Sequence, residues 1–294
     1  MKIKNFYAYS KERFPFINMA LFVILFMTVL CVATYTNGQV VKVGWNEVLG
    51  SLAVISFFFR LRVFDEIKDY AIDSINHPQR VLQSGRIELK HLKVISLAGG
   101  MLEIVWSLMN GEIVFVCWLI AILFAFLMRY EFFVSSFLKK YLLVYALTHM
   151  MIMPLIITWI WSVYANVNIQ INLFLLSSLS LLSGFAFEIA RKIHIKECEK
   201  PLIDSYSKVV GYKGSIFLVL LILAVGVFTQ FQLLHKIDSK TWPFVVIGLL
   251  YFSIIVLYIS GILKPDEKRI RISEVIVSLF MLLSYCSVII EIIF

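Results

Sequence analysis

Long apolar runs recur through the whole length of this sequence, and they constrain its fold more than any other feature. Each run is close to the roughly 20 residues that an α-helix needs to cross the hydrocarbon core of a bilayer. Only a fully hydrogen-bonded helix can cross lipid as an open chain, so the sequence predicts an all-α polytopic membrane protein. The nine predicted transmembrane helices lie at about residues 15–35, 45–64, 92–109, 112–133, 141–164, 171–192, 213–234, 242–263 and 272–294.

The composition supports this class. Hydrophobic residues make up 61% of the chain, and the mean hydropathy is +0.89, which is too apolar for a soluble domain. The first run follows a basic leader but ends without a small-x-small cleavage site, so we expect an anchoring helix rather than a cleaved signal peptide. The four cysteines are scattered without a C-x-x-C pair, which indicates neither a disulfide framework nor a zinc site. With no Gly/Ser linker, we expect one membrane domain over residues 1–294.

The distribution of basic residues predicts the orientation. If the N-terminus is cytoplasmic, all but three of the 27 lysines and arginines fall on the cytoplasmic side, the exceptions being Lys42, Lys236 and Lys240. The net charge of +8 then belongs to the cytoplasmic face. This charge suits anionic lipid headgroups or an anionic substrate. Nucleic acid is not an expected partner, because the chain has no soluble basic domain to bind it.

Two expected cytoplasmic loops, about 65–91 and 193–212, carry most of the mixed charge, while the outer loops carry almost none. They follow the second and the sixth predicted helices. We therefore expect any chemistry to face the cytoplasm and to be built from two related halves of the chain.

The first of these loops opens with four acids: Asp65, Glu66, Asp69 and Asp73. If the second helix continues through residue 73, their spacing places all four on one stripe. Like charges at i,i+4 each cost about 0.2–0.5 kcal/mol, and acids near a helix C-terminus oppose the macrodipole. Nearby Lys68 and Arg62 are too few to neutralise four acids, whereas Mg²⁺ prefers carboxylate oxygens and bridges them to substrate phosphates. The alternative is a solvated acidic helix end without a ligand.

The segment "NHPQRVLQSGRI" favours the metal site over the solvated helix end. It places Asn76, Arg80 and Arg86 directly after the acids, with Gly85 as a turn residue. Arginines recognise phosphate oxygens in a bidentate manner. Acids for a metal, followed by arginines for phosphate, are what a diphosphate site requires.

These residues resemble the first signature of the UbiA superfamily of intramembrane prenyltransferases, N-D-x-x-D-x-x-x-D followed by R-P-L-x-x-G-x-I. Asp65 stands where the signature has Asn and Glu66 where it has Asp, while Asp69 and Asp73 match it. Arg80 and the segment 85–87 match the later part, with Val instead of Pro at position 81. The resemblance covers essentially the whole chain and implies nine helices around a central apolar cavity.

The second signature of that family, E-I-x-K-D-I-x-D-x-E-G-D, is matched less well by "FEIARKIHIKECEKPLIDSYSKVVG". Glu188 and Glu197 align with its glutamates and Glu199 with its last aspartate. Lys192 and Ile195 occupy positions where aspartates are expected, and nearby Asp204 is a possible substitute. The competing interpretation is a basic cytoplasmic loop with incidental acids.

The resemblance implies that Mg²⁺ and basic side chains hold an isoprenyl diphosphate, and that the isoprenyl group passes to an aromatic or other lipophilic acceptor. The metal-ligand candidates are Asp65, Glu66, Asp69, Asp73, Glu188, Glu197, Glu199 and Asp204. The diphosphate-binding candidates are Arg62, Lys68, Arg80, Arg86, Lys139, Lys140, Arg191 and Lys192. Further polar candidates are Asn76, Tyr145 and His149.

Two alternatives stay open at this point. A UbiA-type terpene cyclase would ionise the same diphosphate and trap the cation with the substrate's own double bonds. A non-catalytic carrier or lipid-binding protein is the other. Transporters usually have charges and Gly/Pro breaks near mid-membrane, whereas these acids cluster at one helix end. A phosphatidyl-alcohol transferase would need a D-G-x-x-A-R stretch, which the sequence lacks.

Overall fold

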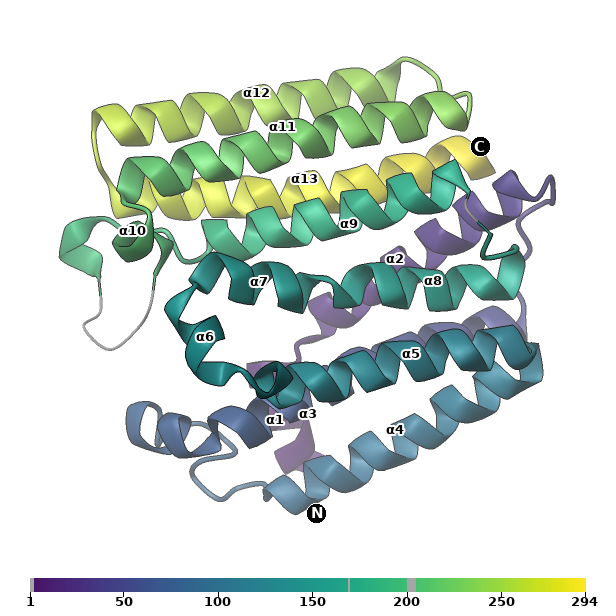
Figure 1. Ribbon diagram of the computed structural model, residues 1–294, viewed down its shortest axis with the longest axis horizontal. Helices are drawn as coiled ribbons and strands as arrows, with labels where there is room; N and C mark the ends of the chain where they lie inside the picture. Colours follow the sequence, from purple (N-terminus) through teal and green to yellow (C-terminus); the bar gives the residue numbers. More distant parts are fainter. Residues whose placement is uncertain (1–2, 169, 200–204) are drawn as a thin grey trace. The chain divides into compact units, whose positions relative to one another are not determined.

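The structure is a computed structural model that describes residues 3–168, 170–199 and 205–294, and Figure 1 shows its helices. Within these ranges the regular secondary structure is entirely helical. The α-helices are α1 (Ile3–Arg13), α2 (Phe16–Thr36), α3 (Trp45–Asn76), α4 (Leu89–Asn110), α5 (Glu112–Arg129), α6 (Ser135–Lys140), α7 (Leu142–Met150), α8 (Ile152–Tyr164), α9 (Ile171–Ala190), α10 (Tyr206–Val209), α11 (Tyr212–Lys236), α12 (Trp242–Leu263) and α13 (Glu267–Ile293). Two 3₁₀ turns, η1 (Glu131–Phe133) and η2 (Lys196–Cys198), complete the described elements.

The prediction of an all-α membrane protein is confirmed. Each of the nine predicted runs coincides largely with a helix or, for 141–164, with the pair α7 and α8. By length and apolarity, eight segments of the described chain qualify as membrane spans: Phe16–Thr36, Leu89–Asn110, Glu112–Arg129, Leu142–Tyr164, Ile171–Ala190, Tyr212–Lys236, Trp242–Leu263 and Glu267–Ile293. The second predicted helix, 45–64, lies in α3, which is not among these eight.

Helix α3 combines an apolar first half with a charged second half. Its 32 residues extend over roughly 48 Å at 1.5 Å per residue, which exceeds the roughly 30 Å of a hydrocarbon core. The helix therefore continues 12 residues beyond the predicted span of 45–64, so the expected loop at 65–91 is helical as far as Asn76. It ends at Asn76, and the next residue, His77, directly precedes Pro78, which disfavours helical geometry at His77.

The fifth predicted run is interrupted rather than continuous. Helix α7 ends at Met150 and α8 begins at Ile152. Pro154 lies in the first turn of α8. In a continuous helix its nitrogen would have to donate to the carbonyl of Met150, but proline has no N–H and its ring clashes with that carbonyl. The proline explains why one apolar segment forms two helices.

The chain forms two compact units. Unit 1 comprises residues 1–27 and 41–133, and unit 2 comprises residues 28–40 and 134–294. Unit 1 packs a core in which Tyr9 and Phe14 from the N-terminal segment meet Phe59, Val63 and Leu92.

In unit 2, helices α9, α11, α12 and α13 lie side by side (Figure 1). Their shared core includes Ile189, Val219, Ile254 and Phe280, all of which are fully buried.

Small residues allow α3 and α4 to pack closely in unit 1. A Cβ atom at Gly99 would lie 2.0 Å from Ser56 Oγ, and one at Gly100 would lie 2.3 Å from a guanidinium nitrogen of Arg60. Backbones that approach this closely are typical of small-residue contacts between membrane helices. The close packing brings Arg60 of α3 to within 2.8 Å of the fully buried Glu103 of α4.

Candidate active site

The four acids of the first predicted signature differ in exposure, although they share the C-terminal half of α3. The Glu66 side chain is fully buried, whereas half of the Asp65 side chain is exposed. Asp69 and Asp73 are partly buried. The stripe therefore runs from solvent-exposed to buried positions rather than lying wholly in solvent.

Three side chains donate to one oxygen of Glu66. Arg13 Nε lies 2.8 Å from Glu66 Oε1, Arg62 Nη2 also lies 2.8 Å from it, and the Tyr9 hydroxyl is 3.4 Å away. The other carboxylate oxygen, Oε2, is buried and has no hydrogen-bond partner among the described residues. Protein donors thus occupy one carboxylate oxygen of Glu66, while the other oxygen can still accept a hydrogen bond or bind a cation.

Asp73 is also held by arginines. Arg80 Nη1 lies 2.6 Å from Asp73 Oδ2, and Arg13 Nη2 lies 3.5 Å from the same oxygen. Arg13 therefore bridges Glu66 and Asp73, which are seven residues, about two turns, apart on α3.

The segment between α3 and α4 is tied to the N-terminal helix. The backbone N–H of Val81 donates to Glu12 Oε2 at 2.8 Å, and the Asn5 side-chain amide donates to the carbonyl of Arg86. These contacts bring residues 78–88 back over α1. They place Arg80 beside the acids that precede it in sequence.

The structure corrects one premise of the sequence argument. The protein's own cations do neutralise Glu66 and Asp73, through Arg13, Arg62 and Arg80. Reasoning from local sequence missed Arg13 because it lies 53 residues before Glu66. Its place in the basic N-terminal segment, on the same expected side of the membrane as the acids, was the signal that could have indicated it.

Asp69 is the acid least committed to other side chains. It makes no hydrogen bond or ion pair with the part of the chain that the structure describes. Loss of hydration raises the pKa of Asp69, and Lys68 opposes that rise. Lys68 itself lies 3.8 Å from Asp65 Oδ1.

The donor chemistry of this stripe fits Mg²⁺. Asp69 and the open oxygen of Glu66 are hard ligands of the kind this ion prefers, and Asp65 is close in sequence. Among described residues, no three His, Cys, Asp or Glu side chains are grouped so as to hold a metal ion. Mg²⁺ usually needs only one or two carboxylates, because waters and substrate phosphates complete its coordination.

The second predicted signature lies at the end of α9 and in the segment that follows. Glu188 pairs with Arg191 at 2.6 Å and with Lys192 at 2.9 Å. Glu199 accepts a hydrogen bond from Ser205 Oγ at 2.7 Å, while Glu197 is exposed. Asp204 lies outside the described residues. Two of the predicted acids are therefore paired with cations or hydroxyls of their own segment.

The remaining predicted site residues occupy varied positions. Asn76, Arg86, Lys139 and Lys140 are exposed. Tyr145 and His149 stack on each other in α7, with ring centroids 4.0 Å apart. The acids of the first signature belong to unit 1 and those of the second to unit 2.

Fold and site together define a multi-pass helical membrane protein with an acid- and arginine-rich polar site. Residues 22–283 match the UbiA prenyltransferase family, so the chain belongs to this family of enzymes.

The sequence identity to individual relatives and solved structures is 31% or less. The chain is 31% identical over 97 residues to digeranylgeranylglyceryl phosphate synthase of Methanosphaera stadtmanae; the match spans 32% of this chain and 36% of that protein. The fold matches a structure of a digeranylgeranylglyceryl phosphate synthase with a TM-score of 0.72 and 19% identity, covering 99% of each chain. It also matches a UbiA homologue from Aeropyrum pernix K1, with a TM-score of 0.70, 12% identity and coverage of 93% and 98%. A homologue from Archaeoglobus fulgidus bound to GPP and Mg²⁺ gives a TM-score of 0.53 at 13% identity, with coverage of 92% and 97%.

Proposed function

We propose that this protein is a Mg²⁺-dependent intramembrane prenyltransferase that moves an isoprenyl group from an isoprenyl diphosphate to a lipophilic acceptor. Family membership supports the reaction class. The observation that carries the proposal is the site on α3. There one oxygen of Glu66 has no hydrogen-bond partner among the described residues, and three arginines pair with Glu66 and Asp73 on either side of Asp69 in the sequence. Candidate metal ligands lie on α3, and cations that could bind phosphate come from α1, from α3 and from the segment after α3.

The residues have distinct roles in this proposal. Asp69 and Glu66, with Asp65 beside them, would hold Mg²⁺, which would neutralise oxygens of the diphosphate when bound. Arg62 and Arg80 supply further positive charge beside the same acids. The acids of the second signature, Glu188, Glu197, Glu199 and Asp204, stay predicted metal ligands.

Departure of the diphosphate breaks the C–O bond of the donor and leaves an allylic cation. The acceptor's nucleophile forms the new bond to this cation and loses a proton. Basic side chains stabilise the negative charge that builds on the leaving diphosphate. An apolar bundle excludes the water that would otherwise capture the cation.

The proposed topology has nine membrane crossings with a cytoplasmic N-terminus. Helix α3 supplies the second of these crossings through its apolar half, 45–64, and carries the acids beyond the lipid. Positive charge on one side of the chain supports this orientation.

A lipid with a glyceryl phosphate headgroup is the acceptor class that the relatives favour. The partial sequence match and a fold match are both to digeranylgeranylglyceryl phosphate synthases. The sequence match spans only 36% of that relative. The acceptor class therefore rests on similarity to these relatives, whereas the donor chemistry rests on the site and the family.

The test is prenyl transfer by the Asp69→Asn variant. We expect Mg²⁺-dependent transfer to be abolished, because Asn removes an anionic metal ligand while the Glu66 and Asp73 ion pairs stay intact. Glu88→Gln is the matched control, since Glu88 is an exposed acid of the same unit that pairs with Lys90. Full activity in Asp69→Asn, with unchanged melting of the folded protein, would contradict the proposal.

A further inference from the structure

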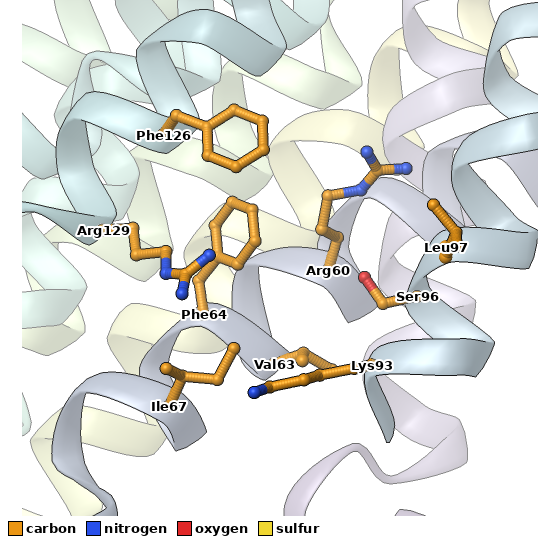
Figure 2. Close-up of a pocket in the computed structure, with 9 residues that line it drawn as sticks. All are labelled: Arg60, Val63, Phe64, Ile67, Lys93, Ser96, Leu97, Phe126 and Arg129. Atoms are coloured by element: carbon orange, nitrogen blue, oxygen red, sulfur yellow. The ribbon is translucent and has the colours of Figure 1, made fainter. Parts of the chain in front are cut away.

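Unit 1 contains a basic cavity that the proposed reaction does not use. Its volume is about 280 Å³, and helices α3, α4 and α5 line it. Figure 2 shows the lining residues. Three of them are cations, one from each helix: Arg60, Lys93 and Arg129.

The cavity lies away from the acidic stripe. Its α3 residues Arg60, Phe64 and Ile67 recur at helical spacing, as do Glu66 and Asp73 of the stripe. With 3.6 residues per turn, the two sets point roughly 140° apart around the helix. The cavity therefore opens on a different side of α3 from the candidate active site.

The cations of the cavity exceed the anions that face them. Only Arg60 has a carboxylate partner, Glu103, and its Nε atom is buried with no hydrogen-bond partner in the described chain. Lys93 and Arg129 form no ion pair with any described residue. Arg129 instead lies over the ring of Phe64, 5.2 Å from its centroid. The cavity thus has the charge of an anion site.

The rim of the cavity is apolar and exposed. Leu97 is 70% exposed and Phe126 is 40% exposed. Their neighbours Val94, Met101 and Leu123 are exposed as well. In a membrane protein, exposed apolar side chains of spanning helices face lipid tails. A ligand seated here would have its charged part among the cations and its apolar part along this rim.

We propose that this cavity binds the phosphate headgroup of an anionic membrane lipid, with the lipid's chains lying along Leu97 and Phe126. Lys93 lies near the start of α4 and Arg129 ends α5, so both cations are at the helix ends where the headgroups of one leaflet lie. Basic pockets between membrane helices bind lipid phosphates in this way. The cavity is somewhat smaller than the roughly 300–1,000 Å³ of small-molecule sites, which suits a headgroup rather than a whole lipid.

In the experiment, the full-length protein in neutral detergent is titrated with short-chain phosphatidylglycerol. Its melting temperature is measured at each lipid concentration. Phosphatidylcholine is the neutral lipid, and inorganic phosphate is the free anion. A ligand that binds the folded state raises the melting temperature in proportion to its saturation. We expect stabilisation by phosphatidylglycerol, and none by the other two at equal concentration.

The variant Lys93→Gln/Arg129→Gln removes the two cations that lack carboxylate partners. We expect its apparent affinity for phosphatidylglycerol to fall about 30-fold, which corresponds to about 1 kcal/mol for each cation. The charge-retaining variant Lys93→Arg/Arg129→Lys should bind as the wild type does. Lys90→Gln is the matched control, because Lys90 is an exposed cation of the same helix that does not line the cavity. If the double variant does not fold, the exposed Lys93→Gln alone should bind about fivefold more weakly.

Four results would overturn the proposal. Equal stabilisation by inorganic phosphate would show that a free anion, not a lipid, is the ligand. An equal loss in Lys90→Gln would show that phosphatidylglycerol binding depends only on overall charge. No loss in the double variant would show that phosphatidylglycerol binds elsewhere on the protein. Loss of prenyl transfer by the double variant at fixed lipid composition would assign the cavity to the substrate, since neither residue belongs to the candidate active site.

Discussion

Removal of Arg13 tests whether the N-terminal helix organises the acidic stripe. Arg13 donates to Glu66 at 2.8 Å and lies 3.5 Å from Asp73, and its own side chain is only 20% exposed. A hydrogen bond to a charged group contributes about 1.5–3 kcal/mol. Breaking a buried ion pair outright costs about 3–5 kcal/mol, but Arg62 would still neutralise Glu66. We therefore expect Arg13→Gln to destabilise the protein by about 1.5–3 kcal/mol.

The assay is equilibrium denaturation in detergent, with prenyl transfer measured on the same samples. Lys11→Gln is the control, because Lys11 is an exposed cation of the same helix and should change stability by less than about 0.5 kcal/mol. Arg13→Lys should recover only part of the loss, since one ammonium group cannot donate to two acids in the geometry of a guanidinium. If Arg13→Gln and Lys11→Gln unfold at the same denaturant concentration, the inferred role of Arg13 is wrong.

Two further predictions concern the packing of unit 1. Gly50→Ala should destabilise the protein by about 1–3 kcal/mol, because its Cβ would lie 2.5 Å from the Trp106 ring and 2.7 Å from the Phe26 ring. Gly226→Ala is the control, because nothing lies within 4 Å of the added Cβ, and it should be neutral or stabilising. Equal melting temperatures for the two variants would refute the packing argument. Glu103→Leu should cost about 3–5 kcal/mol by leaving the guanidinium of Arg60 buried without its partner, and a chemical denaturation curve that overlays the wild type would contradict this.

Hydropathy and helical periodicity predict most of the fold because membrane-spanning helices are determined locally. Apolar length predicted the end of α3 at residue 64, whereas the helix continues to Asn76 through charged residues that hydropathy excludes from a span. The break between α7 and α8 was also present in the sequence, as Pro154, but apolar length alone did not indicate it. Local signals predicted helices well and their interruptions less well.

The site could be predicted only in part. The acids and Arg80 lie within one short segment, so local sequence identifies them together. The ion pairs of Arg13 depend on α1 packing against the segment after α3, which no periodicity encodes. Likewise, Arg60 and Lys93 lie at one cavity only because α3 and α4 pack closely at Gly99 and Gly100.

The most direct test of the central claim is product mass analysis with the purified wild-type protein. The protein would be incubated with geranylgeranyl diphosphate and a glyceryl phosphate lipid acceptor, with Mg²⁺ or with a chelator. The account predicts a product whose mass is that of donor plus acceptor minus diphosphoric acid, formed only with Mg²⁺. A product derived from the donor alone, or no product that depends on Mg²⁺, would contradict it.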